Sequence, residues 1–346
     1  MARVVGCDPG TSSLDLLLWS EGRVVDQARF MPQSLADGAG PLLAKLDAWA
    51  PLDLVAGPSG YGLPLVRGEQ ITPRDIALMA LPASGDLGVD AGIAGFRSRS
   101  AALVTCGHPL VFLPGGIHLP TIPAHRKLNA VDMGTADKIA VAALALWFDT
   151  ERGHRPAAES TFCVAEIGSA FTALLVVDQG RVVDAAAGSR GPIGLKSGGA
   201  WDGEVACLIS PLSKRDVFRG GLVDMGEPGL DAFLESLIKH SAGLRAVTPF
   251  DRIYLSGAGL ADAEVGRIVA RAFQSFEDVR PLPSLDGAWV KHAAQGAALI
   301  ADGLMGGECR VLIEALRLRE ASGTCLDFLT CRGRIGDPGR FGLAAD

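Results

Sequence analysis

The stretch VVGCDPGTSSLDLLLW, residues 4–19, decides the fold, because it consists of two apolar strand-forming segments joined by a short turn. Asp8 ends the first segment, and the turn after it is rich in hydroxyls and backbone N–H groups. The turn residues are Gly10, Thr11, Ser12 and Ser13. Such a hairpin can bind a phosphate through its N–H groups and a hydrated Mg²⁺ through its carboxylate. The alternative is an ordinary turn, since Asp-Pro-Gly-Thr is also a common turn sequence.

The same pattern returns at FCVAEIGSAFTALLVV, residues 162–177, about 158 residues further along the chain. Glu166 takes the place of Asp8, and a small-residue turn follows it. That turn contains Gly168, Ser169 and Ala170. Each copy is followed by the same five-residue sequence, GRVVD, at residues 22–26 and 180–184. This shared order indicates an internal duplication with one phosphate hairpin in each half of the chain.

Composition limits the classes of function that remain open. The chain has 346 residues, 48% of them hydrophobic, which favours two domains with substantial cores. A net charge of −7 argues against a nucleic-acid-binding surface. We expect no membrane span and no signal peptide, because apolar runs are short and Asp8 interrupts the first one. The seven scattered cysteines favour free thiols in a reducing cytoplasm, with a bond between Cys325 and Cys331 as the minor alternative.

Periodicity predicts an α/β chain in which helices alternate with short strands. The predicted helices are 40–50, 72–81, 132–149, 229–246, 263–273, 288–304 and 308–321. Residues 101–115 look strand-like, and Thr72 has the place of a helix N-cap. We predict an N-terminal domain at 1–150 with an insertion at about 60–127. A C-terminal domain at 151–303 and a helical extension at 304–346 complete the prediction.

Five segments in this order resemble the acetate and sugar kinase, heat-shock chaperone and actin superfamily. They are residues 5–16, 132–144, 163–174, 253–259 and 293–303. The resemblance implies two ribonuclease-H-like (actin-like ATPase) domains with a nucleotide cleft between them, and ATP and Mg²⁺ as cofactors. Three motifs also resemble a family of archaeal and bacterial proteins described as predicted butyrate kinases. The motifs are DPGTSSLD, HRKLNAVDMGTADK and DGEVA.

The resemblance implies roles for single residues. Asp8 and Glu166 are the candidate metal ligands. Phosphates are expected at Gly10, Thr11, Ser12, Ser13, Gly168 and Ser169, and adenosine at Gly257, Ala258 and Gly259. Lys214 and Arg215 are candidates for flanking the adenine or ribose, with a solvated helix end as the alternative.

Two further residues are candidates for catalysis itself. Asp132 is expected to open a helix, to cap the N–H of Thr135 and to act as general base. Arg126 is the candidate for binding the acceptor, because an arginine fork suits a carboxylate, with a basic surface loop as the alternative.

The leading hypothesis is ATP- and Mg²⁺-dependent phosphoryl transfer to a small-molecule acceptor, with a short carboxylate as one candidate. The second hairpin departs from the superfamily pattern, since it has Glu166 for the usual Asp and a Gly-Ser-Ala turn. The alternative is therefore a regulatory ATPase that couples hydrolysis to domain closure without a phosphorylated product. A nucleotide-free scaffold is the third hypothesis. A homodimer is left open, by analogy with carboxylate kinases.

Overall fold

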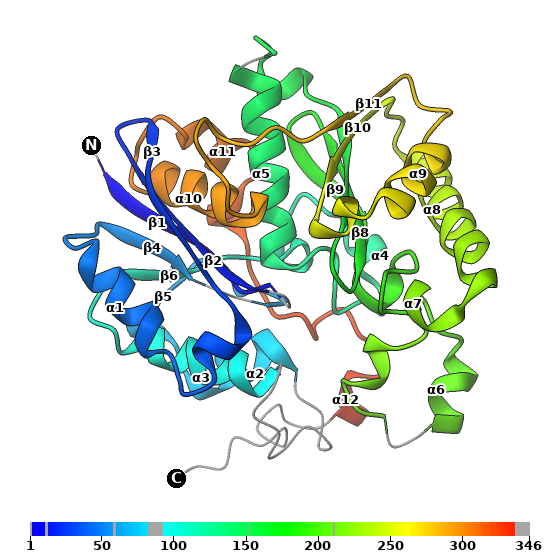
Figure 1. Cartoon of the computed structure of the whole chain (residues 1–346), viewed down its shortest axis with the longest axis horizontal. Coiled ribbons are helices and arrows are strands. Elements are labelled where there is room, and N and C mark those ends of the chain that lie inside the picture. The colour runs from blue at the N-terminus through cyan, green and yellow to red at the C-terminus, as the bar shows by residue number, and fades with distance from the viewer. Residues whose placement is uncertain are drawn as a thin grey trace.

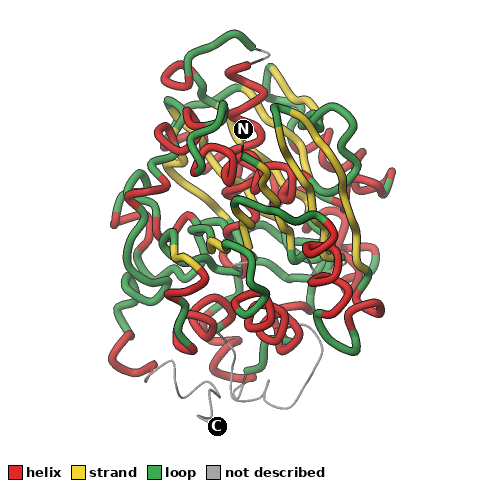
Figure 2. The backbone as a smooth tube through the Cα atoms, turned by 90° about the vertical axis from the view of Figure 1, so that its left-hand side faces the viewer, coloured by secondary structure: helices red, strands yellow, loops and turns green. Residues whose placement is uncertain are grey.

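The computed structural model describes residues 2–10, 13–57, 60–81, 93–151, 153–209 and 212–335. Two mixed β-sheets occupy the two halves of the molecule, with helices α5 (Ala136–Glu151) and α10 (His292–Leu304) between them (Figure 1). Strands of each sheet run side by side through the molecule (Figure 2). The α/β class predicted from the sequence is confirmed.

Each sheet has the same central arrangement of strands. The first sheet contains β1 (Arg3–Asp8), β2 (Leu14–Ser20), β3 (Arg23–Phe30), β4 (Leu54–Gly57), β5 (Val66–Arg67) and β6 (Leu110–Phe112). The second contains β7 (Phe162–Ile167), β8 (Thr172–Asp178), β9 (Arg181–Ala186), β10 (Arg252–Ser256) and β11 (Asp278–Pro281). The orders are β3-β2-β1-β4-β6-β5 and β9-β8-β7-β10-β11. In both, three antiparallel strands are followed by two parallel neighbours, and the first sheet adds β5, which is antiparallel to β6.

The duplication extends to an irregularity in the strands. In the first sheet the β2–β3 register shifts between Leu18 and Trp19. In the second the β8–β9 register shifts between Val176 and Val177, the equivalent place in the repeat. A bulge adds local twist to a strand pair. The two hairpins therefore share a detailed backbone feature, beyond their similar sequences.

The remaining helices surround the sheets, with α8 and α9 over the outer face of the second sheet (Figure 1). They are α1 (Gly40–Ala48), α2 (Pro73–Ala80), α3 (Ile93–Val104), α4 (Ala124–Lys127), α6 (Gly203–Ile209), α7 (Leu222–Met225), α8 (Glu227–Val247), α9 (Ala263–Ala272), α11 (Arg310–Ala315) and α12 (Arg332–Ile335). Thr72 caps α2 in a capping box with Asp75, as predicted for that N-cap. None of the helices that the structure describes is long and apolar enough to cross a bilayer.

Several sequence predictions need correction, among them the helix predicted at 288–304, which begins at His292. The strand-like segment 101–115 is only partly a strand, because it begins as the last turn of α3 and only Leu110–Phe112 joins the sheet. A short apolar run does not distinguish a buried helix from a strand, which explains the error. The helix predicted at 132–149 begins at Ala136, and the one predicted at 308–321 ends at Ala315.

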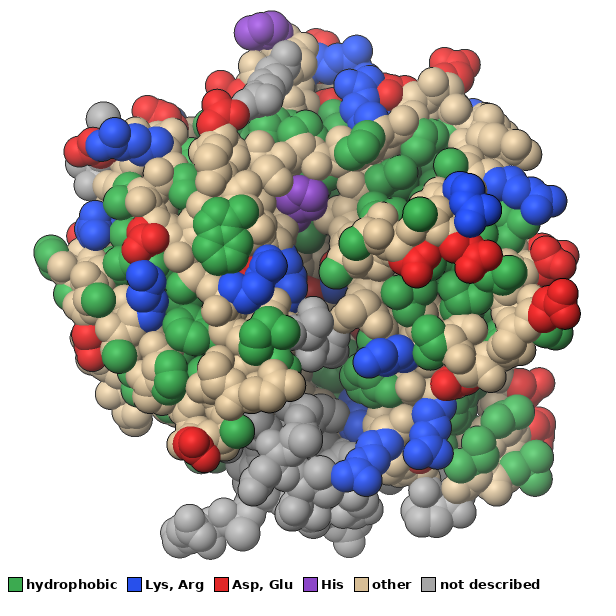
Figure 3. Space-filling model, viewed as in Figure 1, with side chains coloured by type: hydrophobic (Ala, Val, Ile, Leu, Met, Phe, Trp, Pro, Cys, Tyr) green, Lys and Arg blue, Asp and Glu red, His purple; other side chains and the backbone are tan. Residues whose placement is uncertain are grey.

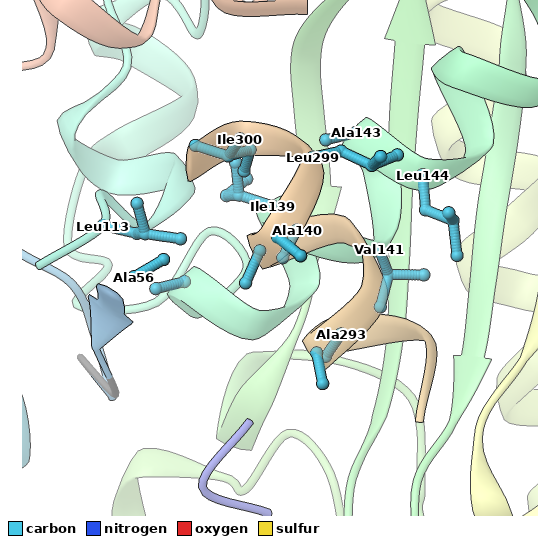
Figure 4. Close-up of a cluster of buried hydrophobic side chains, with 14 of the residues drawn as sticks. Ala56, Leu113, Ile139, Ala140, Val141, Ala143, Leu144, Ala293, Leu299 and Ile300 are labelled. Carbon is cyan, nitrogen blue, oxygen red and sulfur yellow. The ribbon is translucent and has the colours of Figure 1, made fainter. Parts of the chain in front are cut away.

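Helices α5 and α10 pack against each other at very short range through small residues. A Cβ added at Gly296 of α10 would collide with the backbone oxygen of Ala140 on α5. A Cβ added at Gly6 of β1 would likewise collide with the backbone oxygen of Ala294. Figure 4 shows the apolar side chains of the two helices meeting around this contact, among them Ala140 and Leu299. The glycines thus let α10 lie directly on both α5 and β1.

The two helices also connect the halves of the molecule. Helix α5 comes from the predicted N-terminal domain, yet it contacts β7 and β8 of the second sheet. Helix α10 comes from the predicted C-terminal domain, yet it packs on β1, β2 and β4 of the first sheet. The domain boundaries at residues 150 and 303 stay a prediction, and this packing describes how the two halves are joined.

We predict that Gly296→Ala destabilises the protein by about 1–3 kcal/mol, because the added methyl group must displace the α5 backbone. Urea-induced unfolding measures the effect. Gly243→Ala in α8 is the matched control, since nothing lies within 4 Å of a Cβ at that position. The control should be neutral or slightly stabilising, because alanine is the better helix former. Equal stability of the two variants would contradict the close-packing argument.

Candidate functional site

A cavity of about 570 Å³ lies where both hairpin turns meet the first residues of α5 and α10. Figure 3 shows a hollow between the two halves of the molecule, with Lys, Arg and His side chains around it. Among the described residues that line the cavity, the acidic ones are Asp8, Asp137 and Glu166, and the basic ones are Arg29, Lys138 and Lys291. Opposite charges therefore meet in one cavity.

The first hairpin places Asp8 at the cavity, where its side chain is only 3% exposed. Burial raises the pKa of Asp8 to about 6, although the ammonium of Lys291 opposes that shift. Lys291 Nζ lies 3.2 Å from Asp8 Oδ2 and donates to the Ser13 carbonyl at 2.7 Å. Gly10 also lines the cavity, whereas the predicted phosphate ligands Thr11 and Ser12 lie outside the described residues.

Asp15, on the second strand of the same hairpin, connects the hairpin to its neighbours through hydrogen bonds. Its side chain is fully buried and faces Asp8 across the β1–β2 pair. It accepts hydrogen bonds from Ser13 Oγ at 2.7 Å, from the Arg29 guanidinium at 2.6 Å and from the Lys291 backbone N–H at 3.0 Å. The hydroxyl of Ser13, a predicted phosphate ligand, is therefore hydrogen-bonded to Asp15 in this structure. The N-terminus of α10 is held to the hairpin by this carboxylate.

Lys138 joins the two halves of the cavity. Its Nζ lies 2.5 Å from Asp137 Oδ2 and 2.6 Å from Glu166 Oε2. Burial works to lower the pKa of Lys138, but the two carboxylates outweigh it and raise that pKa. Burial raises the pKa of Glu166, and Lys138 opposes that effect. The ammonium thus stays charged and connects the first turn of α5 to the end of β7.

Two glycine-containing turns of the second half meet at the cavity wall. Gly168 begins the turn after Glu166, and its N–H donates to the Phe171 carbonyl at 2.9 Å. Gly257 has a φ of +106°, and a Cβ there would collide with the Ile167 backbone. Gly168, Ser169, Gly257 and Ala258 line the cavity, whereas Gly259 is buried against Ile167 and Gly168.

A histidine and a tryptophan near the start of α10 complete this wall. The His292 ring is hydrogen-bonded to two serine hydroxyls. Its Nδ1 lies 2.8 Å from Ser256 Oγ, and its Nε2 lies 3.2 Å from Ser284 Oγ. Burial lowers the pKa of His292 to about 4, so its ring is neutral at pH 7. Trp289 is 55% exposed at the cavity rim, with the Arg29 guanidinium 5.4 Å from its ring centroid. An exposed ring beside neutral hydrogen-bonding groups suits a heteroaromatic base.

The structure does not bring every sequence-predicted residue to the cavity. Arg126 donates to the Val183 carbonyl at 2.8 Å and lies 3.5 Å from Asp184, both on β9. Lys214 donates to the Tyr61 hydroxyl at 3.0 Å, and Arg215 is exposed. None of these three arginine and lysine residues is part of the cavity lining.

Asp132 requires a correction of its expected local role. It lies four residues before α5 and does not cap Thr135, because its Oδ1 accepts from the Gly134 N–H at 2.8 Å. The chain turns at Gly134, whose φ is +93°, before the helix begins. Burial raises the pKa of Asp132 to about 6. The acidic residue of this segment that lines the cavity is Asp137, not Asp132.

Sequence reasoning missed the lysine of the second connecting helix altogether. Lys291 occupies the N-cap position of α10, and His292 begins that helix. Asp137 and Lys138 occupy the first turn of α5. The available signal was their shared place at the start of the two connecting helices. Both helices begin at the cavity.

The carboxylates fit Mg²⁺ only in combination with a ligand. Within the described ranges, no group of three or more His, Cys, Asp or Glu side chains is arranged to hold a metal ion. Asp8, Asp137 and Glu166 supply the oxygen donors that Mg²⁺ prefers. Since Mg²⁺ is commonly bound by one or two carboxylates together with substrate phosphates, this donor set fits a metal that enters with a nucleotide.

All seven cysteines lie in the described part of the chain, and none of them is in a disulfide. All of them are free thiols, including Cys325 and Cys331. Cys7 lines the cavity, but burial raises the pKa of its thiol far above the usual range. The prediction of free cysteines is confirmed.

One protein family, described as “Protein of unknown function (DUF1464)”, matches residues 6–331, so the chain belongs to this family. No curated protein sequence matches the chain. A propionate kinase from Francisella tularensis subsp. tularensis SCHU S4 has a similar structure, with a TM-score of 0.57 and 11% identity. That match covers 86% of this chain and 98% of the kinase.

Two acetate kinases are similar in the same way. The enzyme from Entamoeba histolytica has a TM-score of 0.54 and 12% identity, over 79% of this chain and 87% of that one. The enzyme from Porphyromonas gingivalis has a TM-score of 0.52 and 12% identity, over 80% and 88%. At these identities the likeness shows the fold alone. The chain therefore has the fold of these acetate and propionate kinases, the fold that the sequence resemblance predicted.

We predict that Asp15→Asn destabilises the protein at neutral pH by about 1.5–3 kcal/mol, the usual contribution of hydrogen bonds to a charged group. Burial acts to raise the pKa of Asp15, but the bonds from Arg29, Lys291 and Ser13 outweigh it and lower that pKa. Such a carboxylate stabilises the fold above its unfolded-state pKa. The contribution is lost as pH falls through the folded-state value.

Urea unfolding at a series of pH values tests this prediction. The deficit of Asp15→Asn relative to the parent chain should be largest near pH 7 and should shrink below about pH 4. Asp231→Asn, at an exposed position on α8, is the control and should show little effect at any pH. A deficit that is the same at every pH would contradict the assigned charge of Asp15.

Proposed function

We propose that this member of the DUF1464 family binds Mg²⁺-ATP in the cavity and transfers the γ-phosphoryl group to a small acceptor, of which a short carboxylate is the favoured class. The observation that carries the proposal is the meeting of both hairpin turns with three carboxylates and three basic side chains in one space. A triphosphate with a divalent cation presents both signs of charge. The cavity offers a partner for each.

The nucleotide is proposed to lie along the second half of the cavity. Trp289 and His292 would contact the base, and the Gly257–Ala258 backbone would approach the ribose and α-phosphate. The phosphates would then reach the two turns at Gly10 and Gly168. Support comes from the place of Gly257 and Ala258 in the cavity lining, where these two residues add little or no side chain between the backbone and a ligand. Gly259 would act by letting the turn pack closely on Ile167.

Phosphoryl transfer depends mainly on positioning and charge stabilisation, which the paired side chains can supply. Lys138 and Lys291 are proposed to move from carboxylates to phosphate oxygens when the nucleotide binds. Asp8 and Glu166 would then hold Mg²⁺, with Asp137 beside them. The metal, when bound, would neutralise charge on the transferring phosphoryl group. Asp8 is ionised above pH 6, as this role requires.

The insertion supports an anionic acceptor. Phe96 of α3 lines the cavity, and Arg99 and Ser100 follow it at the i+3 and i+4 positions of the same helix face. In the described part of the chain, Arg99 Nε and Ser100 Oγ are buried without a hydrogen-bond partner. Burial lowers the pKa of Arg99, an effect that the neighbouring Cys7 opposes. A ligand carboxylate would satisfy these groups.

Arg99 is therefore proposed beside Arg126 as a second candidate for binding the acceptor. Both have a buried Nε without a hydrogen-bond partner in the described part of the chain, and neither is part of the cavity lining. Arg126 already contacts Val183 and Asp184 on β9, away from the cavity lining. A carboxylate acceptor arrives ionised and needs no general base. Asp132 keeps a catalytic role only if the acceptor is an alcohol whose proton must be removed. The choice of acceptor thus also decides whether a base is needed.

We predict that Asp8→Ala abolishes Mg²⁺-ATP turnover while the chain still folds, because a buried carboxylate beside the phosphate turn is lost. Turnover is followed as ADP release, and folding by circular dichroism and melting temperature. Asp37→Ala, at an exposed position, is the control and should keep full activity. Unchanged turnover in Asp8→Ala would remove the basis of the proposal.

We predict that one class of acceptor in a panel of short carboxylates, alcohols and sugars stimulates ATP turnover and yields a phosphorylated product. Arg99→Met should raise the KM for a carboxylate acceptor about tenfold or more, with a smaller effect on the KM for ATP. Arg74→Met, an exposed change in the same insertion, is the matched control.

The same assay separates the remaining functions. Turnover without any phosphorylated product would favour the regulatory ATPase, in which hydrolysis drives domain closure. If Mg²⁺-ATP also fails to raise the melting temperature, the nucleotide-free scaffold is favoured. Either outcome would overturn the kinase proposal.

A further inference from the structure

A second cavity, of about 410 Å³, lies at the opposite end of α5 from the nucleotide cavity. Asp149, in the last turn of α5, forms part of its wall. Asp137 lies twelve residues earlier on the same helix, so the two ends are about 18 Å apart at 1.5 Å per residue. The second cavity therefore shares no lining residue with the first and needs an explanation of its own.

The strand register of the second sheet gathers basic and aromatic side chains at this cavity. Arg252 and Tyr254 are two residues apart on β10 and point to the same face. Arg280 of β11 lies opposite Tyr254 in the parallel pair. Arg155, from the loop after α5, adds a third guanidinium. Three arginines thus line a single small cavity.

Asp149 is buried among these groups with one oxygen unused. Its side chain is 3% exposed, and its Oδ1 accepts from the Tyr254 hydroxyl at 2.9 Å and from Arg252. Its Oδ2 is buried and has no hydrogen-bond partner in the described part of the chain. Leaving a buried charged oxygen unpaired is costly, so a donor from a ligand would be favourable there.

The charge balance indicates the sign of that ligand. Arg252 and Arg280 share Asp278, which accepts from both. With Asp149 and Asp278 counted, three guanidinium groups face two carboxylates, and the excess is positive. Among the residues that the structure describes, Arg155 makes no salt bridge, and the Arg280 side chain is half exposed. Guanidinium groups bind planar oxyanions through paired N–H donors.

We propose that this cavity is a binding site for a small oxyanion that also carries a hydroxyl or ammonium group. The oxyanion would lie between Arg155 and Arg280, and its donor would reach Asp149 Oδ2. Both a carboxylate and a phosphate ester have the required oxygen atoms. The site is separate from the proposed nucleotide chemistry, and the proposal stands or falls independently of it.

Isothermal titration calorimetry on the full chain, without nucleotide, tests the proposal with three probes. L-glutamate is the carboxylate probe with an ammonium group, and 3-phosphoglycerate is the phosphate probe with a hydroxyl. Acetate is an oxyanion without a second donor. At least one of the first two should bind at millimolar concentration or below, and acetate should bind more weakly.

Variants separate a built site from general attraction of anions. Arg155→Ala and Arg280→Ala should each weaken binding of the preferred probe about tenfold, or 1.4 kcal/mol. Both side chains are on the rim, so folding should persist. Arg23→Ala, at a 73% exposed arginine elsewhere, is the matched control and should bind normally.

Asp8→Ala gives a second control, since it alters only the first cavity. Probe binding that persists in Asp8→Ala but weakens in Arg280→Ala supports the second site. Binding that is lost in Asp8→Ala assigns the probe to the first cavity and overturns the proposal. So does the absence of binding by both probes, which would leave the arginines as a purely structural network around α5.

Discussion

The contact between α5 and α10 is the constraint on which the rest of the structure depends. Backbone meets backbone there, because Gly296 has no side chain to separate the helices and Gly6 lets α10 lie on β1. Interiors packed to this density do not deform gradually. The two helices, which contact opposite sheets, therefore have one relative position. That position brings the first turn of each helix to the same cavity.

The charges in the cavity follow from this geometry. Asp137 and Lys138 arrive from α5, Lys291 from the N-terminus of α10, and Asp8 and Glu166 from the two hairpins. Pairing keeps these buried groups charged, since each carboxylate that burial would neutralise has an ammonium close by. Paired charges can exchange partners when a ligand with both signs of charge enters, which is the physical basis of the proposed nucleotide site.

The insertion shows where sequence reasoning about chemistry is weakest. Arg126 was a reasonable acceptor ligand because it precedes the first connecting helix, yet its guanidinium is engaged by β9. Arg99, in the same insertion, was not singled out, because one arginine in a helix of mixed composition gives no local signal. Its significance rests on burial without a partner, which is a property of the packed chain. Lys291 was missed because its partners, Asp8 and Ser13, lie more than 270 residues away in the sequence.

The sequence by itself determined the duplicated hairpins, the free cysteines, the N-cap at Thr72 and the two small-residue connecting helices, because each depends on residues close together in the chain. The structure adds to the repeat an equivalent strand irregularity in each copy, at Leu18 and Val176. Only the tertiary structure decided that Lys138 pairs with Glu166, that Lys291 reaches Asp8, and that the chain before α5 turns at Gly134. The two lysine contacts join segments distant in sequence, and local patterns carry no information about which distant side chain becomes the partner. The turn at Gly134 sets where α5 begins, which the helical pattern of the sequence did not show.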